Sequence, residues 1–225
     1  MSQRFRSSRA VGLAGLLLVA GVLFPRLASL GRPAVRTPSA VERGERALGE
    51  GRFFRAEIAF RQALFSPEGD RALGRLGQLA LLRGEEQEAQ ERLRAAVQLH
   101  PEDANSWACL GWLEWKRGER TLAEEAWRQG LSVRGHFLVH ALRGEAAYQS
   151  RAMAEARQEF ASLLADSAPP DWQAWAHLRL GTLDAYADPA SALAHWRAAL
   201  KAGPVGGETW SPPPELIFRK PSGET

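Results

Sequence analysis

Small and bulky apolar residues recur along most of this chain at helical spacing, in units of similar length. In each unit a Gly is followed 11 or 12 residues later by an Ala, and four residues after that by a bulky apolar residue. The five sets are Gly44, Ala56 and Phe60; Gly77, Ala89 and Leu93; Gly111, Ala123 and Trp127; Gly144, Ala156 and Phe160; and Gly181, Ala192 and Trp196. The units repeat at steps of 33, 34, 33 and 36 or 37 residues. A period in this range is typical of a solenoid.

Each unit predicts two helices joined by a short turn. The Gly and the Ala, one on each helix, allow the two backbones to approach closely, and the bulky residue fills the space beside them. Apolar pairs further along, such as Ala63 with Leu64 and Leu163 with Leu164, keep one face of the second helix apolar. Residues that stop helices close the units at Pro67, Pro101, Gly135, Pro169 and Pro204.

This pattern resembles the tetratricopeptide repeat family, in which Trp, Leu, Gly, Tyr, Gly, Ala, Phe, Ala and Pro stand at fixed offsets. The third unit matches best, with Trp107, Leu110, Gly111, Gly118, Ala123, Trp127 and Leu131 in register. The resemblance implies an all-α fold, a right-handed superhelical solenoid of five helix-turn-helix repeats over residues 37–204. The expected repeats are 37–69, 70–103, 104–136, 137–170 and 171–204.

The chain also departs from the family pattern. The family's Tyr is replaced by Ala47, Ala80, Glu114, Ala147 and Asp184. The Gly between the two helices is lost at Arg151 and Asp188, and the fifth unit is one residue shorter there. That last turn is still compatible with a helix start, because Asp188 is a good N-cap and Pro189 suits the first helical position.

An apolar stretch precedes the repeats. Residues 1–9 form a basic segment, and Ala10 to Phe24 is a run of fifteen residues without a charge, which 27–30 extend beyond Arg26. A bilayer core requires about 20 apolar residues, so we expect residues 10–30 to be a transmembrane signal-anchor helix, with 31–36 as a linker. Two alternatives remain open: a cleaved signal peptide, although residues 27–29 match the cleavage pattern poorly, and a buried cytosolic helix.

Charge limits the choice of partners and gives a weak indication of topology. The formal net charge is +3, but residues 1–36 contain six Arg and no acid, so the remainder has 29 − 6 = 23 basic against 26 acidic side chains. Nucleic acid is therefore not an expected partner. The basic residues around residues 10–30 slightly favour an inside N-terminus, and we expect extracytoplasmic, periplasmic repeats on a single-pass membrane protein. Cytoplasmic-facing and secreted forms are the alternatives.

The tetratricopeptide resemblance implies that the inner groove binds a protein or peptide partner through positions on the first helices. Mapped from each Gly, the candidate groove residues are Gln78, Leu81, Leu82, Trp112, Trp115, Lys116, Glu145, Tyr148, Gln149 and Tyr186. Trp112 and Trp115 share one face of their predicted helix because they are three residues apart. Two interpretations stay open for them: an exposed aromatic strip that receives a partner, or core packing between neighbouring repeats.

Sequence motifs for catalysis are weak. His136 and His140 are spaced as two metal ligands on one helix would be, but no further ligand completes a set, and we expect neither a metal nor a cofactor. Cys109, the single cysteine, permits no internal disulfide, and we expect it to be a small packing residue rather than a reactive thiol. The chain has no phosphate-binding Gly loop and no nucleophile elbow.

The sequence therefore predicts a membrane-anchored scaffold or adaptor that mediates protein–protein interaction in assembling an envelope or membrane complex. It is not expected to be an enzyme or to bind a small-molecule substrate. A permanent structural subunit of a larger membrane complex is the alternative. The Pro- and Gly-rich tail, 205–225, contains Trp210 and the apolar run 216–218, and three roles are open for it: covering the last repeat, docking onto a partner, or remaining free.

Overall fold

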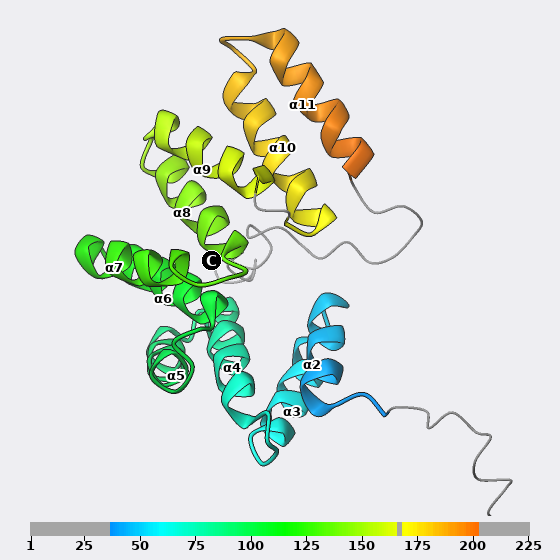
Figure 1. The fold of residues 1–225 in the computed structure, drawn as a ribbon, viewed down its shortest axis with the longest axis vertical. Coiled ribbons are helices and arrows are strands. Elements are labelled where there is room, and N and C mark those ends of the chain that lie inside the picture. The colour runs from blue at the N-terminus through cyan, green and yellow to red at the C-terminus, as the bar shows by residue number, and fades with distance from the viewer. Residues whose placement is uncertain (1–36, 166–167, 203–225) are drawn as a thin grey trace, which may run out of the picture. The chain divides into compact units, whose positions relative to one another are not determined.

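The computed structural model describes residues 37–165 and 168–202, and over these residues the chain forms ten α-helices and no strand (Figure 1). The helices are α2 (Ala40–Gly49), α3 (Phe53–Ala63), α4 (Gly69–Arg83), α5 (Glu86–Leu99), α6 (Ala104–Lys116), α7 (Arg120–Leu131), α8 (Phe137–Gln149), α9 (Met153–Ala165), α10 (Pro170–Asp184) and α11 (Pro189–Ala202). The all-helical class expected from the sequence is confirmed.

Parts of the predicted organisation lie outside the described residues. These are the basic segment 1–9, the expected span 10–30, the linker 31–36 and the tail 205–225. No helix within residues 37–165 and 168–202 has the length and apolar character needed to cross a bilayer.

Consecutive helices pair into five hairpins: α2 with α3, α4 with α5, α6 with α7, α8 with α9, and α10 with α11. Neighbouring hairpins meet where the second helix of one packs on the first helix of the next, and α6 also packs on α4 and α8. Buried apolar side chains form one cluster in the first hairpin and the start of α4, and a larger one from Ala80 to Leu180. This is the repeat architecture of helical hairpins that the tetratricopeptide resemblance predicts.

The predicted glycine contacts are present in all five hairpins. A Cβ added to any of the five repeat glycines would lie closer than 3.0 Å to the bulky side chain predicted to be its partner, for example Leu93 Cγ for Gly77 and the Trp127 indole for Gly111. Each glycine therefore leaves the space that a ring or branched side chain from the second helix fills. The partner side chains of the first four hairpins are 0–2% exposed.

The turns inside the hairpins show how the fourth and fifth repeats manage without the family's inter-helix Gly. Gly51, Gly84 and Gly118 have φ values of 69°, 76° and 87°, in the left-handed region that favours glycine. Arg151 keeps the same conformation in the fourth hairpin, with φ of 62°, although it carries a side chain. In the shorter fifth turn, Asp188 Oδ1 accepts a hydrogen bond from Ser191 N at 3.1 Å, and α11 begins at Pro189, as the sequence predicts.

Buried acids replace the family's Tyr at two of the five positions, and each meets the preceding hairpin. Glu114 on α6 is 3% exposed, and its Oε1 accepts hydrogen bonds from Gln90 Nε2 and Arg94 Nη2 on α5, both at 2.9 Å. A buried carboxylate without such donors would be strongly destabilising. These contacts therefore fix which side chains of α5 lie against α6.

Asp184 at the end of α10 is held in the same way. It accepts hydrogen bonds from Arg157 on α9 and from Ser191 Oγ, the latter at 3.0 Å. Burial acts to raise the pKa of Asp184, but the hydrogen bonds from Arg157 and Ser191 outweigh it, so the pKa lies below its ordinary value. The carboxylate is thus charged at neutral pH and ties the fifth hairpin to the fourth.

The last hairpin leaves its partner residue accessible. Trp196 is 39% exposed, whereas Trp127 at the equivalent position of the third hairpin is 2% exposed. Leu178, Leu193 and Leu200 on the same hairpin are also exposed. The fifth hairpin therefore presents an apolar surface within the described part of the chain.

We predict that Gly111→Ala destabilises the protein, although Ala favours a helix over Gly by about 1 kcal/mol. The new Cβ would overlap the Trp127 ring, and such overpacking costs about 1–3 kcal/mol. Urea unfolding measures the free energy of unfolding. Trp127→Ala, which removes the ring that the new Cβ would meet, should relieve the overlap, so the double variant should be more stable than the sum of the two single effects. If the losses in the free energy of unfolding of the two single variants simply add in the double variant, the contact between residue 111 and the Trp127 ring does not limit how closely α6 and α7 pack.

Candidate protein-interaction surface

The ten predicted groove residues lie on α4, α6 and α8 and just after α10, but they differ in accessibility. Three are buried: Leu81, Trp112 and Glu145. Four are half-buried: Gln78, Leu82, Trp115 and Tyr148. Three are exposed: Lys116, Gln149 and Tyr186. The surface available to a partner therefore consists of the last seven.

Of the two interpretations left open for Trp112, the exposed aromatic strip is wrong. Trp112 is 2% exposed and belongs to the large apolar cluster. The reason is that α6 packs against α4, α5, α7 and α8, which leaves little of its circumference free. Core packing, the alternative weighed for this residue, is the correct interpretation. Leu81 is 7% exposed and belongs to the same buried apolar cluster.

Trp115 lies at the edge of that core and retains partial exposure. Its ring stacks on Trp112 with centroids 4.9 Å apart and planes inclined by 25°. The Arg120 guanidinium lies 4.9 Å from the Trp115 ring centroid, a cation–π arrangement. A small hollow of about 80 Å³ borders Trp115 and Arg120, between the third and fourth hairpins. The indole is thus held in one orientation beside an opening in the surface.

Tyr148 is held by a similar arrangement one hairpin further along. The Arg179 guanidinium lies 5.2 Å from the Tyr148 ring centroid and 5.5 Å from that of Trp175. Arg179 Nη2 also pairs with the buried Glu145 Oε2 at 2.8 Å, and Gln149 Nε2 donates to Glu145 Oε1 at 3.0 Å. Glu145 therefore orients the arginine and the amide around Tyr148 rather than offering its carboxylate to a partner.

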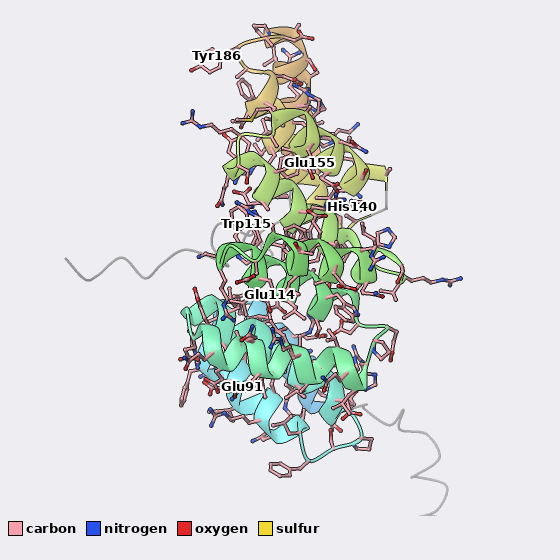
Figure 2. The ribbon with its side chains drawn as sticks, turned by 90° about the vertical axis from the view of Figure 1, so that its left-hand side faces the viewer. Glu91, Glu114, Trp115, His140, Glu155 and Tyr186 are labelled. Atoms are coloured by element: carbon pink, nitrogen blue, oxygen red, sulfur yellow. The ribbon has the colours of Figure 1, made fainter. Side chains whose placement is uncertain are left out.

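The two ends of the predicted surface are simpler. Gln78 Oε1 accepts a hydrogen bond from Arg75 Nη1 at 3.2 Å. Tyr186 is fully exposed and projects away from the ribbon, whereas Trp115 lies against the helices (Figure 2). Tyr186 is the most accessible aromatic side chain of the predicted set.

The histidines at 136 and 140 and the single cysteine are each held by contacts within the array. His136 is the N-cap residue of α8, and its Nδ1 lies 2.7 Å from Val133 O. His140 Nδ1 lies 2.7 Å from Glu159 Oε2. In the part of the chain that the structure describes, no three His, Cys, Asp or Glu side chains are grouped so that they could hold a metal. Burial raises the pKa of the Cys109 thiol to about 12, so it is protonated at neutral pH and unreactive as a nucleophile.

Sequence reasoning missed the arginines of this surface. Arg120 begins α7, the second helix of its hairpin, and Arg179 lies on the first helix α10 but two residues before Gly181, which is not one of the mapped groove positions. Their roles depend on contact with Trp115 and with Tyr148 of other helices, 5 and 31 positions away in sequence. A search for basic residues on helices that flank predicted aromatic positions would have identified them.

Comparison with known proteins yields matches only among solved structures. No protein-family model matches the chain, and no curated protein does. One crystal structure of MamA has a TM-score of 0.47 and 18% identity, covering 72% of this chain and 89% of that chain. A second crystal structure of MamA has a TM-score of 0.49 and 18% identity, covering 71% of this chain and 93% of that chain. The fold assignment above rests on this chain's own helices and glycine contacts.

We predict that Trp112→Ala and Trp115→Ala differ in their effect on stability. Removing a fully buried indole costs about 3–5 kcal/mol, whereas the half-buried Trp115 loses less apolar contact and should cost clearly less. Urea unfolding followed by circular dichroism gives both values. Equal losses would mean that Trp115 is as much a part of the core as Trp112.

Proposed function

We propose that this protein is a membrane-anchored scaffold or adaptor that binds a protein or peptide partner and serves the assembly of an envelope or membrane complex. Its array is a solenoid of tetratricopeptide type with a right-handed superhelical twist, it lies on the extracytoplasmic side, and it has no catalytic activity of its own. The observation that carries the proposal is the pair of aromatic side chains, Trp115 and Tyr148, each held under an arginine on an accessible part of the array.

Preorganised aromatic and arginine side chains support binding because they lose little conformational entropy when a partner arrives. Trp, Tyr and Arg are also the residue types that contribute most to binding energy at protein interfaces. Trp115 and Arg120 border the hollow between the third and fourth hairpins, and the exposed Lys116, Gln149 and Tyr186 extend the surface. We therefore assign partner binding to this set of side chains.

The membrane anchor in the proposal rests on sequence alone. Residues 10–30 hold the longest apolar stretch outside the repeat pattern, and they lie before the described residues. The same stretch, if cleaved as a signal peptide, would give a secreted periplasmic protein with the same array.

A permanent structural subunit is a second candidate, and one observation favours it. The fifth hairpin exposes Leu178, Leu193, Trp196 and Leu200, and apolar surface of this kind is usual where two proteins remain in contact. A permanent partner would cover this surface at all times, whereas an adaptor would leave Trp115 and Tyr186 free between encounters.

We predict that Trp115→Ala with Tyr186→Ala lowers the amount of partner recovered on affinity purification from solubilised membranes by at least about tenfold, because two interface anchors contribute about 2 kcal/mol each. Quantitative mass spectrometry of the co-purified proteins measures it. Phe65→Ala with Leu99→Ala is the control: it removes two exposed apolar side chains, 94% and 57% exposed, from outside the proposed surface. Unchanged recovery with the first pair, or an equal loss with the control pair, would refute the assignment of this surface.

We also predict that the full-length chain stays with the membrane pellet after a carbonate wash, whereas a chain that begins at Thr37 remains in the supernatant with the same helical circular dichroism. The physical reason is that residues 10–30 alone approach the length of about 20 apolar residues that a bilayer core requires. N-terminal sequencing of the recovered protein is the control. A mature chain that starts near Leu30 and is absent from the pellet would identify a cleaved signal peptide.

A further inference from the structure

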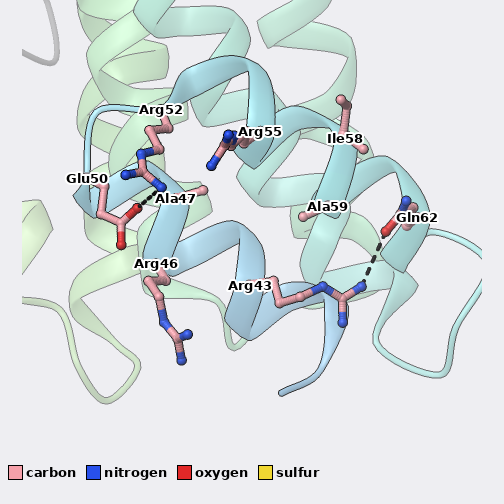
Figure 3. Close-up of a pocket in the computed structure, with 9 residues that line it drawn as sticks. All are labelled: Arg43, Arg46, Ala47, Glu50, Arg52, Arg55, Ile58, Ala59 and Gln62. Carbon is pink, nitrogen blue, oxygen red and sulfur yellow. Dashed lines mark hydrogen bonds and ion pairs between the residues drawn. The ribbon is translucent and has the colours of Figure 1, made fainter. Parts of the chain in front are cut away.

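The first hairpin contains an open hollow of about 430 Å³ between α2 and α3 (Figure 3). It is lined only by side chains of these two helices and of the turn between them: Arg43, Arg46, Ala47, Glu50, Arg52, Arg55, Ile58, Ala59 and Gln62. We call this set the arginine hollow. None of the ten predicted groove residues lines it.

Two acids of the first hairpin pair with arginines of α4 rather than with those of the hollow. Glu45 Oε1 lies 3.0 Å from Arg75 Nη2, and Glu57 Oε2 lies 2.5 Å from Arg83 Nη2, while Glu57 Oε1 also pairs with Arg61 of its own helix. The arginine hollow has four arginines and only Glu50, a net charge of 4 − 1 = +3. Residues 37–225 as a whole have 23 − 26 = −3. A solvated end of the array requires polar side chains but does not require one sign of charge.

The arginines of the hollow retain hydrogen-bonding capacity. Arg52 Nη1 lies 3.0 Å from Glu50 Oε2, and Arg43 Nη2 donates to Gln62 Oε1 at 3.3 Å. Arg46 and Arg55 are exposed and have no ion pair or hydrogen bond with another side chain among residues 37–165 and 168–202, and Figure 3 draws no dashed line from either to another residue of the hollow. A guanidinium group offers five donors in a planar fork that matches a phosphate or a carboxylate.

Exposed apolar side chains accompany these charges. Phe54 and Ile58, one turn apart on α3, are 72% and 42% exposed, and Ile58 lines the arginine hollow itself. Arginines beside exposed aromatic and aliphatic side chains are typical of surfaces that meet a bilayer, where phosphates and the first acyl carbons lie close together. A bilayer surface offers phosphates to the guanidinium groups and acyl carbons to Phe54 and Ile58 together.

We propose that the arginine hollow binds the phosphate groups of acidic phospholipids at the bilayer surface, with Arg46 and Arg55 as the main ligands. This proposal rests on the membrane anchor of the proposed function. The expected span ends at Leu30, and the first hairpin starts with the N-cap Ser39 of α2, nine residues later. Nine extended residues reach about 30 Å at most, so an anchored chain keeps this hairpin near the headgroups. The hollow then orients the array against the membrane.

The test uses the full-length chain in nanodiscs made either of phosphatidylcholine alone or of phosphatidylcholine mixed with phosphatidylglycerol. Hydrogen–deuterium exchange of the peptides that cover residues 40–63 measures protection of the first hairpin. We expect several-fold slower exchange in the discs that contain phosphatidylglycerol, and a loss of this difference at high salt. Arg46→Gln with Arg55→Gln should abolish the difference. Arg46→Lys with Arg55→Lys should retain part of it, because the charge remains but the planar fork is lost.

Arg128→Gln with Arg197→Gln is the matched control, since it removes the same charge from two exposed arginines of other hairpins. A wild-type chain that shows no dependence on phosphatidylglycerol while retained in the discs overturns the proposal, and so does an equal loss in the control pair. Equal protection by soluble glycerophosphate with discs of phosphatidylcholine alone would identify a free phosphate ligand and overturn the lipid assignment.

Failure of the anchor is distinguishable from failure of the arginine hollow. A chain that elutes apart from the discs on gel filtration refutes the anchor. The same chain is then floated with vesicles of phosphatidylcholine alone or mixed with phosphatidylglycerol. If the chain floats with the phosphatidylglycerol vesicles and Arg46→Gln with Arg55→Gln abolishes this flotation, the arginine hollow is supported as a lipid site. If the chain does not float with them, the proposal is overturned.

Discussion

In each hairpin, the two helices come close because a glycine leaves room for a bulky side chain from the other helix. The Trp127 indole occupies the place that a Cβ on Gly111 would take, and Phe60, Leu93 and Phe160 occupy equivalent places. Close packing makes such a contact intolerant of added volume. Every other feature depends on it, because the spacing within a hairpin decides which side chains of α6 and α8 are covered and which reach the surface.

Contacts between hairpins depend on a second, polar constraint. Glu114 and Asp184 stand where the repeat family has a Tyr, and each draws an arginine from the preceding hairpin. Buried ion pairs add little net stability compared with apolar packing, but breaking one leaves a buried charge and is costly. The polar contacts therefore fix the alignment of neighbouring hairpins more than they stabilise them. Glu145 has the same effect through Arg179, which is how Tyr148 obtains its cation–π partner.

The sequence predicts the contacts within hairpins better than the exposure of their outer faces. The glycine partners and the cap at Asp188 follow from spacing, because both are local to one or two helices. For Trp112 the sequence leaves a free surface and core packing both open, because periodicity does not say how many helices surround α6. The arginine hollow was missed for another reason. The net charge of the whole array hides a local group of arginines, at positions 43 and 46 on α2, at 52 in the turn and at 55 on α3.

The first and fifth hairpins differ in what they expose, and this difference bears on how a scaffold of this kind acts. A hairpin in the middle has its apolar residues covered by neighbours on both sides, so its free side chains are few and fixed, as Trp115 is between Trp112 and Arg120. Among residues 37–165 and 168–202, the first and the fifth hairpin each pack on one neighbouring hairpin only, which leaves one face of each without a repeat against it. The first presents arginines, and the fifth presents Trp196 and leucines. The arginines of the first hairpin suit an anionic surface, and the apolar residues of the fifth suit an apolar partner. A chain bound to both would hold its partner at a set distance from the membrane.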